Sequence, residues 1–196
     1  MPIRSVCVYC GAHLGHHPNY AATAARFGQL LAQQGLELIY GGGNIGLMGV
    51  VADAALQAGG RVTGIIPRRL AEKEVAHFDL SELILVDSMH ERKLEMANRA
   101  DAFVALPGGI GTLEELFEVF TWQQLGFHDK PIGLLDVEGY YQPLLDFLAQ
   151  SVTSGFLRAE HRDLLLTATT PEDLLTRLLA AAPQVSDQWY DHRQQT

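Results

Sequence analysis

Residues 101–106, Asp-Ala-Phe-Val-Ala-Leu, form a nearly apolar run that predicts a strand covered on both faces. Comparable short runs alternate along the chain with longer segments of helical periodicity. This alternation predicts right-handed crossovers and an α/β fold, in which a single-domain, Rossmann-like parallel sheet carries helices on both faces. We expect strands at 3–9, 36–40, 61–66, 82–86, 101–106, 131–135 and 163–167, and helices at 18–34, 46–58, 88–99, 112–125, 139–153 and 171–181.

The composition of the 196-residue chain agrees with one such domain. Hydrophobic residues make up 47% of the chain and charged residues 19%, which is enough apolar material for a buried core. We expect the domain to cover residues 1–182 and a polar tail to follow at 183–196. The formal charge of −9 argues against nucleic acid or an anionic membrane surface as a partner. No signal peptide and no apolar run of about 20 residues is recognised, so the sequence predicts a cytoplasmic protein.

Glycine is concentrated in two places, because eight of the 19 glycines lie at 41–49 and 108–111. Both segments follow a predicted strand and open a predicted helix, where parallel sheets bind their ligands. The first glycine loop, residues 41–49, contains Gly41, Gly43 and Gly46 in the spacing G-x-G-x-x-G of a dinucleotide site. Glycines in such a turn let backbone N–H groups approach a phosphate. A tight turn that needs glycine only for packing explains the same residues, and both interpretations stay open.

The second glycine loop, residues 107–112, belongs to the segment P-G-G-I-G-T-L-E-E at 107–115. Its glycines leave the turn open and Thr112 adds a hydroxyl. The loop therefore predicts a second phosphate cradle, without the Gly-Lys-Ser/Thr of a nucleoside triphosphatase. Thr112 and Glu115 also fit the capping box T-x-x-E, which would explain both residues without any chemistry. Capping leaves the glycines unexplained.

The predicted helix at 88–99 is rich in charge. Ser88 and Glu91 fit a capping box at its start. We expect this helix and the helix after the second glycine loop to start from adjacent strands, which would place its cations near the ligand. A solvated charged face is the commoner explanation of a basic pair. One face of the helix carries Met89, Arg92, Lys93 and Met96.

Together these segments resemble the Lonely Guy family of cytokinin-activating phosphoribohydrolases, whose members were often labelled lysine decarboxylases. The resemblance rests on P-G-G-I-G-T-L-E-E, on M-H-E-R-K at 89–93 and on G-G-G-N-I-G-L-M-G at 41–49. It extends from the first strand to about residue 155 and includes T-W-Q-Q-L-G-F-H-D-K-P-I-G-L-L at 121–135. It implies hydrolysis of the N-glycosidic bond of a nucleoside 5′-monophosphate, such as AMP or an N6-modified AMP, to the free base and ribose 5-phosphate.

The resemblance also implies roles for individual residues. Arg92 and Glu115 would be catalytic, Lys93 would lie near the nucleotide, and the second glycine loop would hold the phosphate. The set of expected substrate-binding residues is Gly42, Gly43, Glu74, Met89, Lys93, Gly108, Gly109, Gly111, Thr112, Glu114 and Thr121.

These roles agree with the chemistry of the side chains. Cleavage of a glycosidic bond builds oxocarbenium-like positive charge on the ribose. A carboxylate such as Glu115 would either stabilise this charge or activate the attacking water. Glu114 would hold ribose hydroxyls. Arg92 would hold the phosphate or assist the leaving group. The scheme requires no metal and no cofactor.

Cys7 and Cys10 form C-x-x-C, a spacing found in redox and zinc sites. Residues three apart in a strand point to opposite faces, so the two sulfurs could not meet. A structural role is therefore predicted for both. Cys10 and Gly11 follow the first strand and are candidates for the wall of the nucleotide pocket.

Two alternative functions stay open. One is a non-catalytic nucleotide-binding module in which Thr112 and Glu115 only cap a helix. The other is an NADP-dependent oxidoreductase that uses the first glycine loop. It is disfavoured because that loop follows the second strand, and the next strand ends at Pro67-Arg68-Arg69 instead of an acidic residue for the ribose. The helix at 112–125 is apolar on more than one face, which predicts a homodimer contact.

Overall fold

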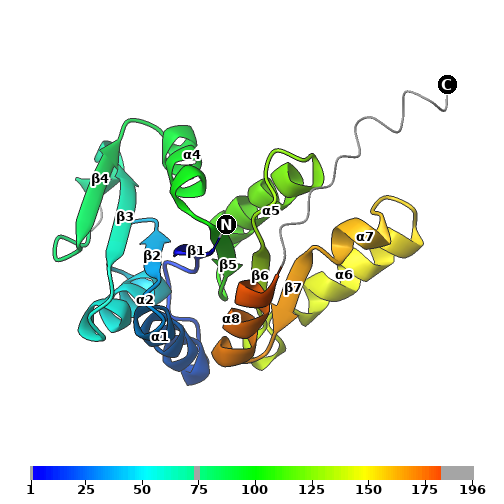
Figure 1. Ribbon diagram of the computed structural model, residues 1–196, viewed down its shortest axis with the longest axis horizontal. Coiled ribbons are helices and arrows are strands. Elements are labelled where there is room, and N and C mark those ends of the chain that lie inside the picture. Colours follow the sequence, from blue (N-terminus) through cyan, green and yellow to red (C-terminus); the bar gives the residue numbers. More distant parts are fainter. Residues whose placement is uncertain (1, 73–75, 182–196) are drawn as a thin grey trace.

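A computed structural model describes residues 2–72 and 76–181. Its core is one seven-stranded sheet in the order β4-β3-β2-β1-β5-β6-β7, and every neighbouring pair is parallel (Figure 1). The predicted α/β fold is therefore confirmed, and the predicted tail at 183–196 lies outside the described residues. The strands are β1 (Ser5–Tyr9), β2 (Glu37–Tyr40), β3 (Val62–Pro67), β4 (Glu82–Val86), β5 (Ala102–Ala105), β6 (Ile132–Leu135) and β7 (Leu165–Ala168).

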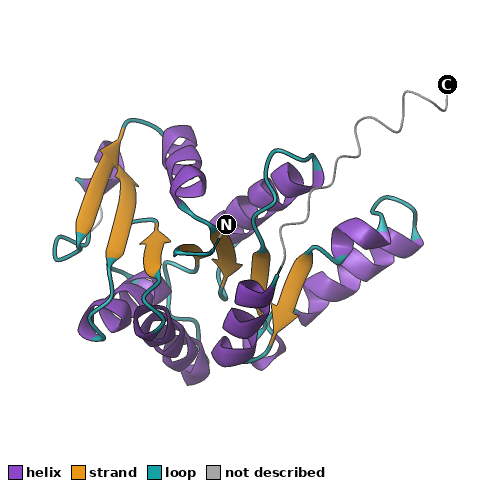
Figure 2. Cartoon of the chain, in the orientation of Figure 1, coloured by secondary structure: helices purple, strands orange, loops and turns teal. Residues whose placement is uncertain are grey.

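Helices cover both faces of the sheet (Figure 2). One face is packed by α1 (Pro18–Gln33), α2 (Gly46–Gln57) and α8 (Pro171–Ala180). The other face is packed by α4 (Met89–Arg99), α5 (Ile110–Gln124) and α6 (Gln142–Thr153). Short helices α3 (Arg68–Ala71) and α7 (Ala159–Arg162) and the 3-10 turn η1 (Val137–Gly139) lie in the connections. Within the described ranges, no helix has the length and apolar character to cross a membrane.

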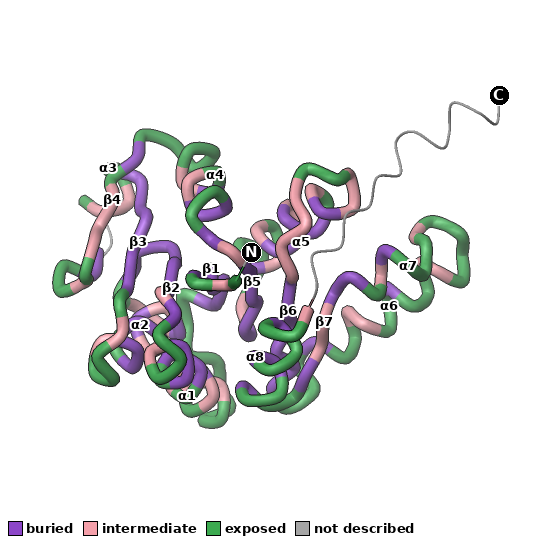
Figure 3. Tube along the Cα trace, viewed as in Figure 1, coloured by how far each residue is buried: buried purple, intermediate pink, exposed green. Residues whose placement is uncertain are grey.

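The strands bury alternate side chains in two separate hydrophobic clusters, as the pleat requires. Val6 and Val8 of β1 belong to the cluster under α1 and α2, whereas Cys7 and Tyr9 belong to the cluster under α4 and α5. Figure 3 shows the burial concentrated along the strands and the exposure along the outer turns. Cys10 joins the cluster opposite Cys7, and both thiols are free and buried. The structural interpretation of C-x-x-C is confirmed.

The sheet has its topological switch point between β1 and β5. The chain leaves β1 toward α1 on one face and leaves β5 toward α5 on the other face, which opens a crevice at the carboxyl ends of these strands. Gly11 lies in this crevice and contacts both glycine loops. Its N–H donates to the Pro107 carbonyl at 3.0 Å, and its carbonyl accepts from the Leu47 N–H at 2.9 Å.

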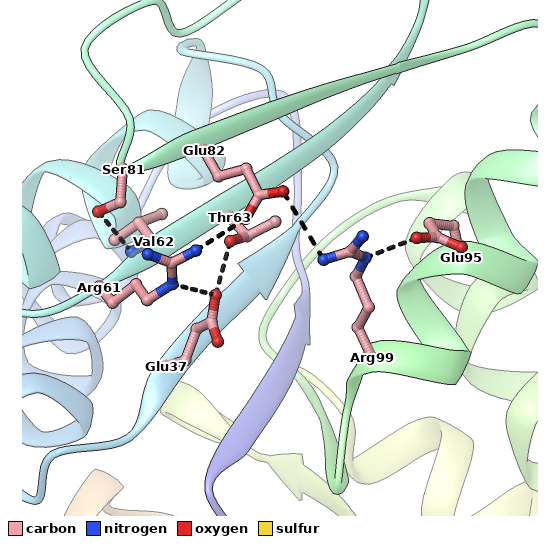
Figure 4. Close-up of polar contacts among 8 residues, drawn as sticks. All are labelled: Glu37, Arg61, Val62, Thr63, Ser81, Glu82, Glu95 and Arg99. Atoms are coloured by element: carbon pink, nitrogen blue, oxygen red, sulfur yellow. Dashed lines mark hydrogen bonds and ion pairs between the residues drawn. The ribbon is translucent and has the colours of Figure 1, made fainter.

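The opposite end of the sheet is held by charged side chains (Figure 4). Arg61 pairs with Glu37 at 3.0 Å and with Glu82 at 2.7 Å, which joins the starts of β2, β3 and β4. Arg99, at the end of α4, lies 3.8 Å from Glu82 and 2.6 Å from Glu95. These groups are at least partly exposed, so each pair contributes no more than about 1 kcal/mol. The network fixes the far end of α4, whose other end reaches the crevice.

Candidate active site

A cleft of about 470 Å³ lies at the carboxyl ends of β1, β2, β3 and β5. The loops that follow β1, β2 and β5 form its walls, and the first turns of α4 and α5 enter it. Both segments predicted to hold a phosphate therefore reach the same crevice. Cys10 and Gly11 line it, as the sequence suggested.

The second glycine loop presents an uncapped helix start to this cleft. The N-cap of α5 is Gly109, whose backbone is extended, and no side chain caps the helix. The first intrahelical hydrogen bond runs from the Leu113 N–H to the Gly109 carbonyl, so the N–H groups of residues 110–112 have no partner within the helix. A Cβ added at Gly109 or Gly111 would meet no atom within 4 Å. These free N–H groups and the positive end of the helix dipole suit an anion.

This geometry corrects the capping interpretation of the second glycine loop. Thr112 is the third residue of α5 and not its N-cap, so Thr112 and Glu115 form no capping box. The helix starts earlier than the T-x-x-E pattern suggests because Gly109 already adopts the backbone of an N-cap. Thr112 is buried and lines the cleft. Ser88, by contrast, caps α4 as predicted, because its hydroxyl accepts from the Glu91 N–H at 3.1 Å.

Glu115 lies in the second turn of α5 and lines the cleft, where its side chain is partly buried. Burial raises the pKa of this carboxyl from 4.5 to about 7. The positive charge of Arg92 opposes that shift, and the neighbouring Glu114 carboxylate adds to it. A group with this pKa exists in both protonation states near neutral pH, which is the property of a general acid or base.

Arg92 is held at the ends of β2 and β3. Its Nη2 donates to the Gly41 carbonyl at 2.9 Å, and its Nε donates to the Ile65 carbonyl at 3.1 Å. A Cβ added at Gly41 would lie 1.9 Å from Nη2, so the guanidinium occupies the space that a side chain at position 41 would need. The remaining nitrogen, Nη1, lies 3.8 Å from the Met89 sulfur in the cleft. Arg92 is therefore a fixed donor and not a mobile cation.

The expectation that α4 and α5 start from adjacent strands is wrong. Three strands, β3, β2 and β1, separate β4 from β5 in the sheet. The segment after β4 returns across the sheet face, and α4 contacts β1, β2, β3 and β4 on its way to β5. Arg92 reaches the cleft because of this crossover, and it does so above β2 and β3 and not beside the second glycine loop.

Lys93 joins α4 to α5 instead of lining the cleft. Its ammonium group is buried and pairs with Glu114 at 2.5 Å and with Glu118 at 3.0 Å. These hydrogen bonds raise the pKa of Lys93, so the ammonium stays charged. Glu114 itself lines the cleft, which means that Lys93 acts on the site through the carboxylate it holds.

The predicted substrate-binding residues divide into two groups. Gly42 is turned away from the cleft, because a Cβ there would meet Ile66 and the Ile65 nitrogen of β3. Thr121 is exposed farther along α5, and it is not among the described residues that line the cleft. Glu74 lies outside the described residues. The residues that line the cleft as expected are Gly43, Met89, Arg92, Gly108, Gly109, Gly111, Thr112, Glu114 and Glu115.

The first glycine loop fits the packing interpretation better than the phosphate interpretation. A Cβ at Gly46 would lie 2.2 Å from the backbone of Ala12, and one at Gly49 would lie 2.2 Å from the Asn44 carbonyl oxygen. These glycines permit close approach of protein and not of a ligand. An NADP site would need Arg68 or Arg69 for the 2′-phosphate of the cofactor. Arg68 pairs with Asp87 at 3.3 Å, and neither arginine is among the described residues that line the cleft.

Several residues of the cleft escaped the sequence analysis. Tyr20 of α1 and Tyr140, just after η1, form one rim, with their rings edge to face and 5.8 Å apart. Met48, Ile66 and Leu70 supply apolar side chains to the wall of the cleft. The position of Tyr140 shortly after the predicted strand at 131–135 was the available signal, because that strand ends at the same edge of the sheet.

Comparison with known proteins agrees with this arrangement. A family model described as "Possible lysine decarboxylase" matches residues 48–178. Cytokinin riboside 5′-monophosphate phosphoribohydrolase LOG5 of Arabidopsis thaliana is 49% identical over 180 residues, covering 92% of this chain and 79% of the relative. Cytokinin riboside 5′-monophosphate phosphoribohydrolase LOG of Oryza sativa subsp. japonica is 47% identical over 181 residues, covering 92% of this chain and 75% of the relative.

Solved structures share the fold. The molybdenum cofactor binding protein of Rippkaea orientalis superposes with a TM-score of 0.67 at 25% identity, covering 90% of this chain and 95% of that one. The molybdenum cofactor carrier protein of Chlamydomonas reinhardtii gives 0.68 at 20% identity, covering 91% and 99%, which shows the fold alone. The sequence relatives are far closer, at 47% and 49% identity over 92% of this chain. This chain belongs to the Lonely Guy family, the family of the cytokinin riboside 5′-monophosphate phosphoribohydrolases.

Proposed function

We propose that this protein is a phosphoribohydrolase that cleaves the N-glycosidic bond of AMP or an N6-modified AMP, giving the free base and ribose 5-phosphate. One observation carries the proposal: a single helix, α5, offers free N–H groups for a phosphate at its start and a carboxyl with a pKa of about 7 in its second turn. The names of the relatives support it, since they are enzymes that act on cytokinin riboside 5′-monophosphates.

The sheet order gives the nucleotide an orientation. The second glycine loop follows β5, whereas the carbonyl that anchors Arg92 follows β2, two strands away in the order β2-β1-β5. Neighbouring strands are about 4.8 Å apart, so the two groups are separated by roughly 10 Å. A ligand with a phosphate at one end and an apolar base at the other fits this span. The base would rest on the wall of Met48, Ile66 and Leu70 beside Arg92.

The reaction follows from this placement. Water forms a bond to C1′ of the ribose while the bond from C1′ to the base nitrogen breaks, and the electron pair goes to the base. Glu115 as a carboxylate stabilises the positive charge on the ribose and takes the proton of the attacking water. The N–H groups of Arg92 that are not used on Gly41 and Ile65 stabilise the charge on the leaving base. Glu114, held by Lys93, would accept hydrogen bonds from the ribose hydroxyls.

The direct test is product analysis. Purified protein incubated with AMP, and separately with N6-isopentenyl AMP, should release adenine or the modified base together with ribose 5-phosphate. Adenosine, which lacks the phosphate, should react far more slowly and is the matched control. Binding of AMP without release of base from either nucleotide would contradict the hydrolase and support the non-catalytic module. Oxidation of NADPH by the protein would support the oxidoreductase.

We also propose that the active protein is a homodimer in the cytoplasm. Ile110 of α5 is 83% exposed and Leu94 of α4 is 52% exposed, and Leu113 and Phe117 on α5 are only partly buried. An apolar surface on two neighbouring helices suits a second copy of the chain. Sedimentation analysis should give twice the monomer mass, and a monomer at working concentration would contradict the dimer.

A further inference from the structure

The peptide groups that lead into α5 share a feature that the family motif does not explain. Each of the three consecutive carbonyls at residues 106–108 accepts a hydrogen bond from another part of the chain. Tyr141 Oη donates to the Leu106 carbonyl at 2.7 Å, and Tyr140 Oη donates to the Gly108 carbonyl at 2.5 Å. Between them, the Gly11 N–H donates to the Pro107 carbonyl at 3.0 Å.

These three bonds matter because of where the carbonyls lie. The three peptide groups end at the N–H of Gly109, one residue before the free N–H groups of residues 110–112, which we assign to the phosphate. Rotation of the Gly108–Gly109 peptide would turn the partly negative Gly108 oxygen toward the anion and would move the residue from which α5 starts. The Leu106–Pro107 peptide carries no N–H, and its orientation sets the course of the chain into that turn. Three external donors fix the orientation of all three peptides before the ligand arrives, which lowers the cost of binding.

The turn that supplies the two hydroxyls is itself fixed by contacts. The N–H of Tyr141 donates to the Asp136 carboxylate at 2.7 Å, and the Tyr141 ring is fully buried. Glu138 adopts a left-handed backbone with φ 55°, a conformation that costs a non-glycine residue of order 1 kcal/mol or more. Its carboxylate accepts from Asn19 of α1 at 2.6 Å, which helps to hold the turn in this shape.

We propose that Tyr140 and Tyr141 are positioning residues for the 5′-phosphate, acting through the carbonyls of Gly108 and Leu106. They would set the affinity for the phosphate and leave the chemical step at Glu115 unchanged. This inference rests on the proposed function for the identity of the anion. It implies that every substrate loses affinity equally when the hydroxyls are removed, whatever its base.

The test removes single oxygen atoms. Tyr140→Phe and Tyr141→Phe keep the rings and delete the hydroxyls, and binding of ribose 5-phosphate is measured by calorimetry. Each variant should raise the Kd by about fivefold, which corresponds to one ordinary hydrogen bond, and the double variant should raise it by more than about tenfold. The KM for AMP should rise in parallel, while kcat and the inhibition constant of free adenine should change less than about twofold.

Tyr40→Phe is the matched control. The Tyr40 hydroxyl lies in the interior at the end of β2 and has no hydrogen-bond partner among the described residues, so its removal should leave the Kd of ribose 5-phosphate unchanged. Thermal unfolding of each variant shows whether it is folded, and Tyr140→Phe decides the question alone if Tyr141→Phe does not fold, because Tyr140 is 42% exposed.

The outcomes separate the two proposals. Wild-type protein that neither binds ribose 5-phosphate nor releases adenine would overturn the proposed function. Wild-type protein that does both, with Tyr140→Phe binding ribose 5-phosphate equally well, would overturn the positioning role alone. Equal weakening of adenine and ribose 5-phosphate would also overturn it, since that pattern reports a generally loosened cleft.

Discussion

The two glycine loops look alike in sequence and differ in what surrounds them. Both follow a buried strand and open a helix at the same edge of the sheet. In the first loop, the space beside Gly41 is filled by Arg92, and the space beside Gly46 is filled by backbone. In the second loop, the space beside Gly109 and Gly111 is open to the cleft. The comparison teaches that Gly41 and Gly46 of the first loop serve protein packing, whereas Gly109 and Gly111 of the second loop leave access for a ligand; Gly108 is packed, because a Cβ there would lie 2.1 Å from Thr112 Oγ1.

The largest expected effect tests whether the helix of the second loop carries the chemistry. Glu115→Gln should lower kcat on AMP by about 10³-fold, within the range of general acid–base catalysis, with little change in ribose 5-phosphate affinity. Glu118→Gln, one turn along the same helix, is the control and should lose less than about tenfold. Steady-state kinetics measure both. Full activity of Glu115→Gln would contradict a catalytic role for this carboxyl group.

The same substitution has a stability consequence with a definite sign. Folding raises the pKa of Glu115 from 4.5 to about 7, so the folded state binds more protons than the unfolded state between these values and loses stability as the pH rises through them. Removing the group should therefore increase the free energy of unfolding above pH 7 by up to about 3 kcal/mol. Urea denaturation at pH 5 and pH 8 should show a gain that is larger at pH 8.

The next effect tests the packing role of the first loop. Gly41→Ala would place a methyl carbon 1.9 Å from Arg92 Nη2, so the guanidinium must leave its two carbonyl partners. We expect kcat to fall by about 10²-fold, which is typical of a displaced catalytic group. Gly43→Ala should have a much smaller effect, because its Cβ would meet only the flexible end of Met48 at 3.0 Å.

A double-mutant cycle shows whether that loss acts through Arg92. In an Arg92→Ala background, Gly41→Ala should cost almost nothing further, since the group it displaces is already absent. Additive losses would mean that Gly41 serves the fold and not the arginine. That result would contradict the claim that Gly41 is needed to make room for the Arg92 guanidinium.

Stability measurements compare the loops directly. Gly46→Ala forces a side chain onto a residue with φ 58° and 2.2 Å from backbone, so it should lower the free energy of unfolding by about 2–4 kcal/mol. Gly111→Ala adds a methyl group in open space within a helix, so stability should change by no more than about 1 kcal/mol. The KM of Gly111→Ala for AMP should rise all the same. Chemical denaturation that gives equal losses would contradict the distinction.

The smallest effect concerns the pH profile. Lys93 lowers the pKa of Glu115, whereas Glu114 and Glu118 raise it. Lys93→Met removes the positive charge that lowers this pKa and leaves the Glu114 and Glu118 carboxylates without their cation. The pKa of Glu115 should therefore rise above about 7. Activity that depends on the Glu115 carboxylate would then be lost at a higher pH as the solution is acidified. Lys93→Arg keeps the charge and should leave the profile close to that of the wild type.

Much of the fold was predictable because strand burial and helix periodicity are local properties. The apolar runs at 36–40 and 82–86 mark β2 and β4 closely. The order of the strands in the sheet is not a local property, which is why the strands that precede the helices of Arg92 and Glu115 were wrongly predicted to be adjacent. The T-x-x-E pattern is local, but it predicted the wrong start for α5. The helix begins after Gly109, so Thr112 already lies inside it.

The sequence identified site residues whose reactive side chains stand next to a predicted strand end. It missed contacts between residues that are far apart in the sequence. Glu115 and Arg92 stand in motifs at strand ends, so the sequence singled them out. The partner of Gly41 is 51 positions away, and the partner of the Tyr140 hydroxyl is 32 positions away. No periodicity or spacing carries such pairings, because they depend on which loops the sheet brings together.

Gly11 makes the two loops a single unit of motion. The Gly11 N–H donates to the Pro107 carbonyl before α5, and the Gly11 carbonyl accepts from the Leu47 N–H at the start of α2. Neither loop can therefore open far without breaking a hydrogen bond to Gly11. The amide protons of Gly11 and Leu47 should therefore report the same free energy of opening in hydrogen exchange, as members of one cooperative opening event. A ligand held by the second loop should slow the exchange of both amides, so that phosphate binding at the second loop is also detected at the first loop.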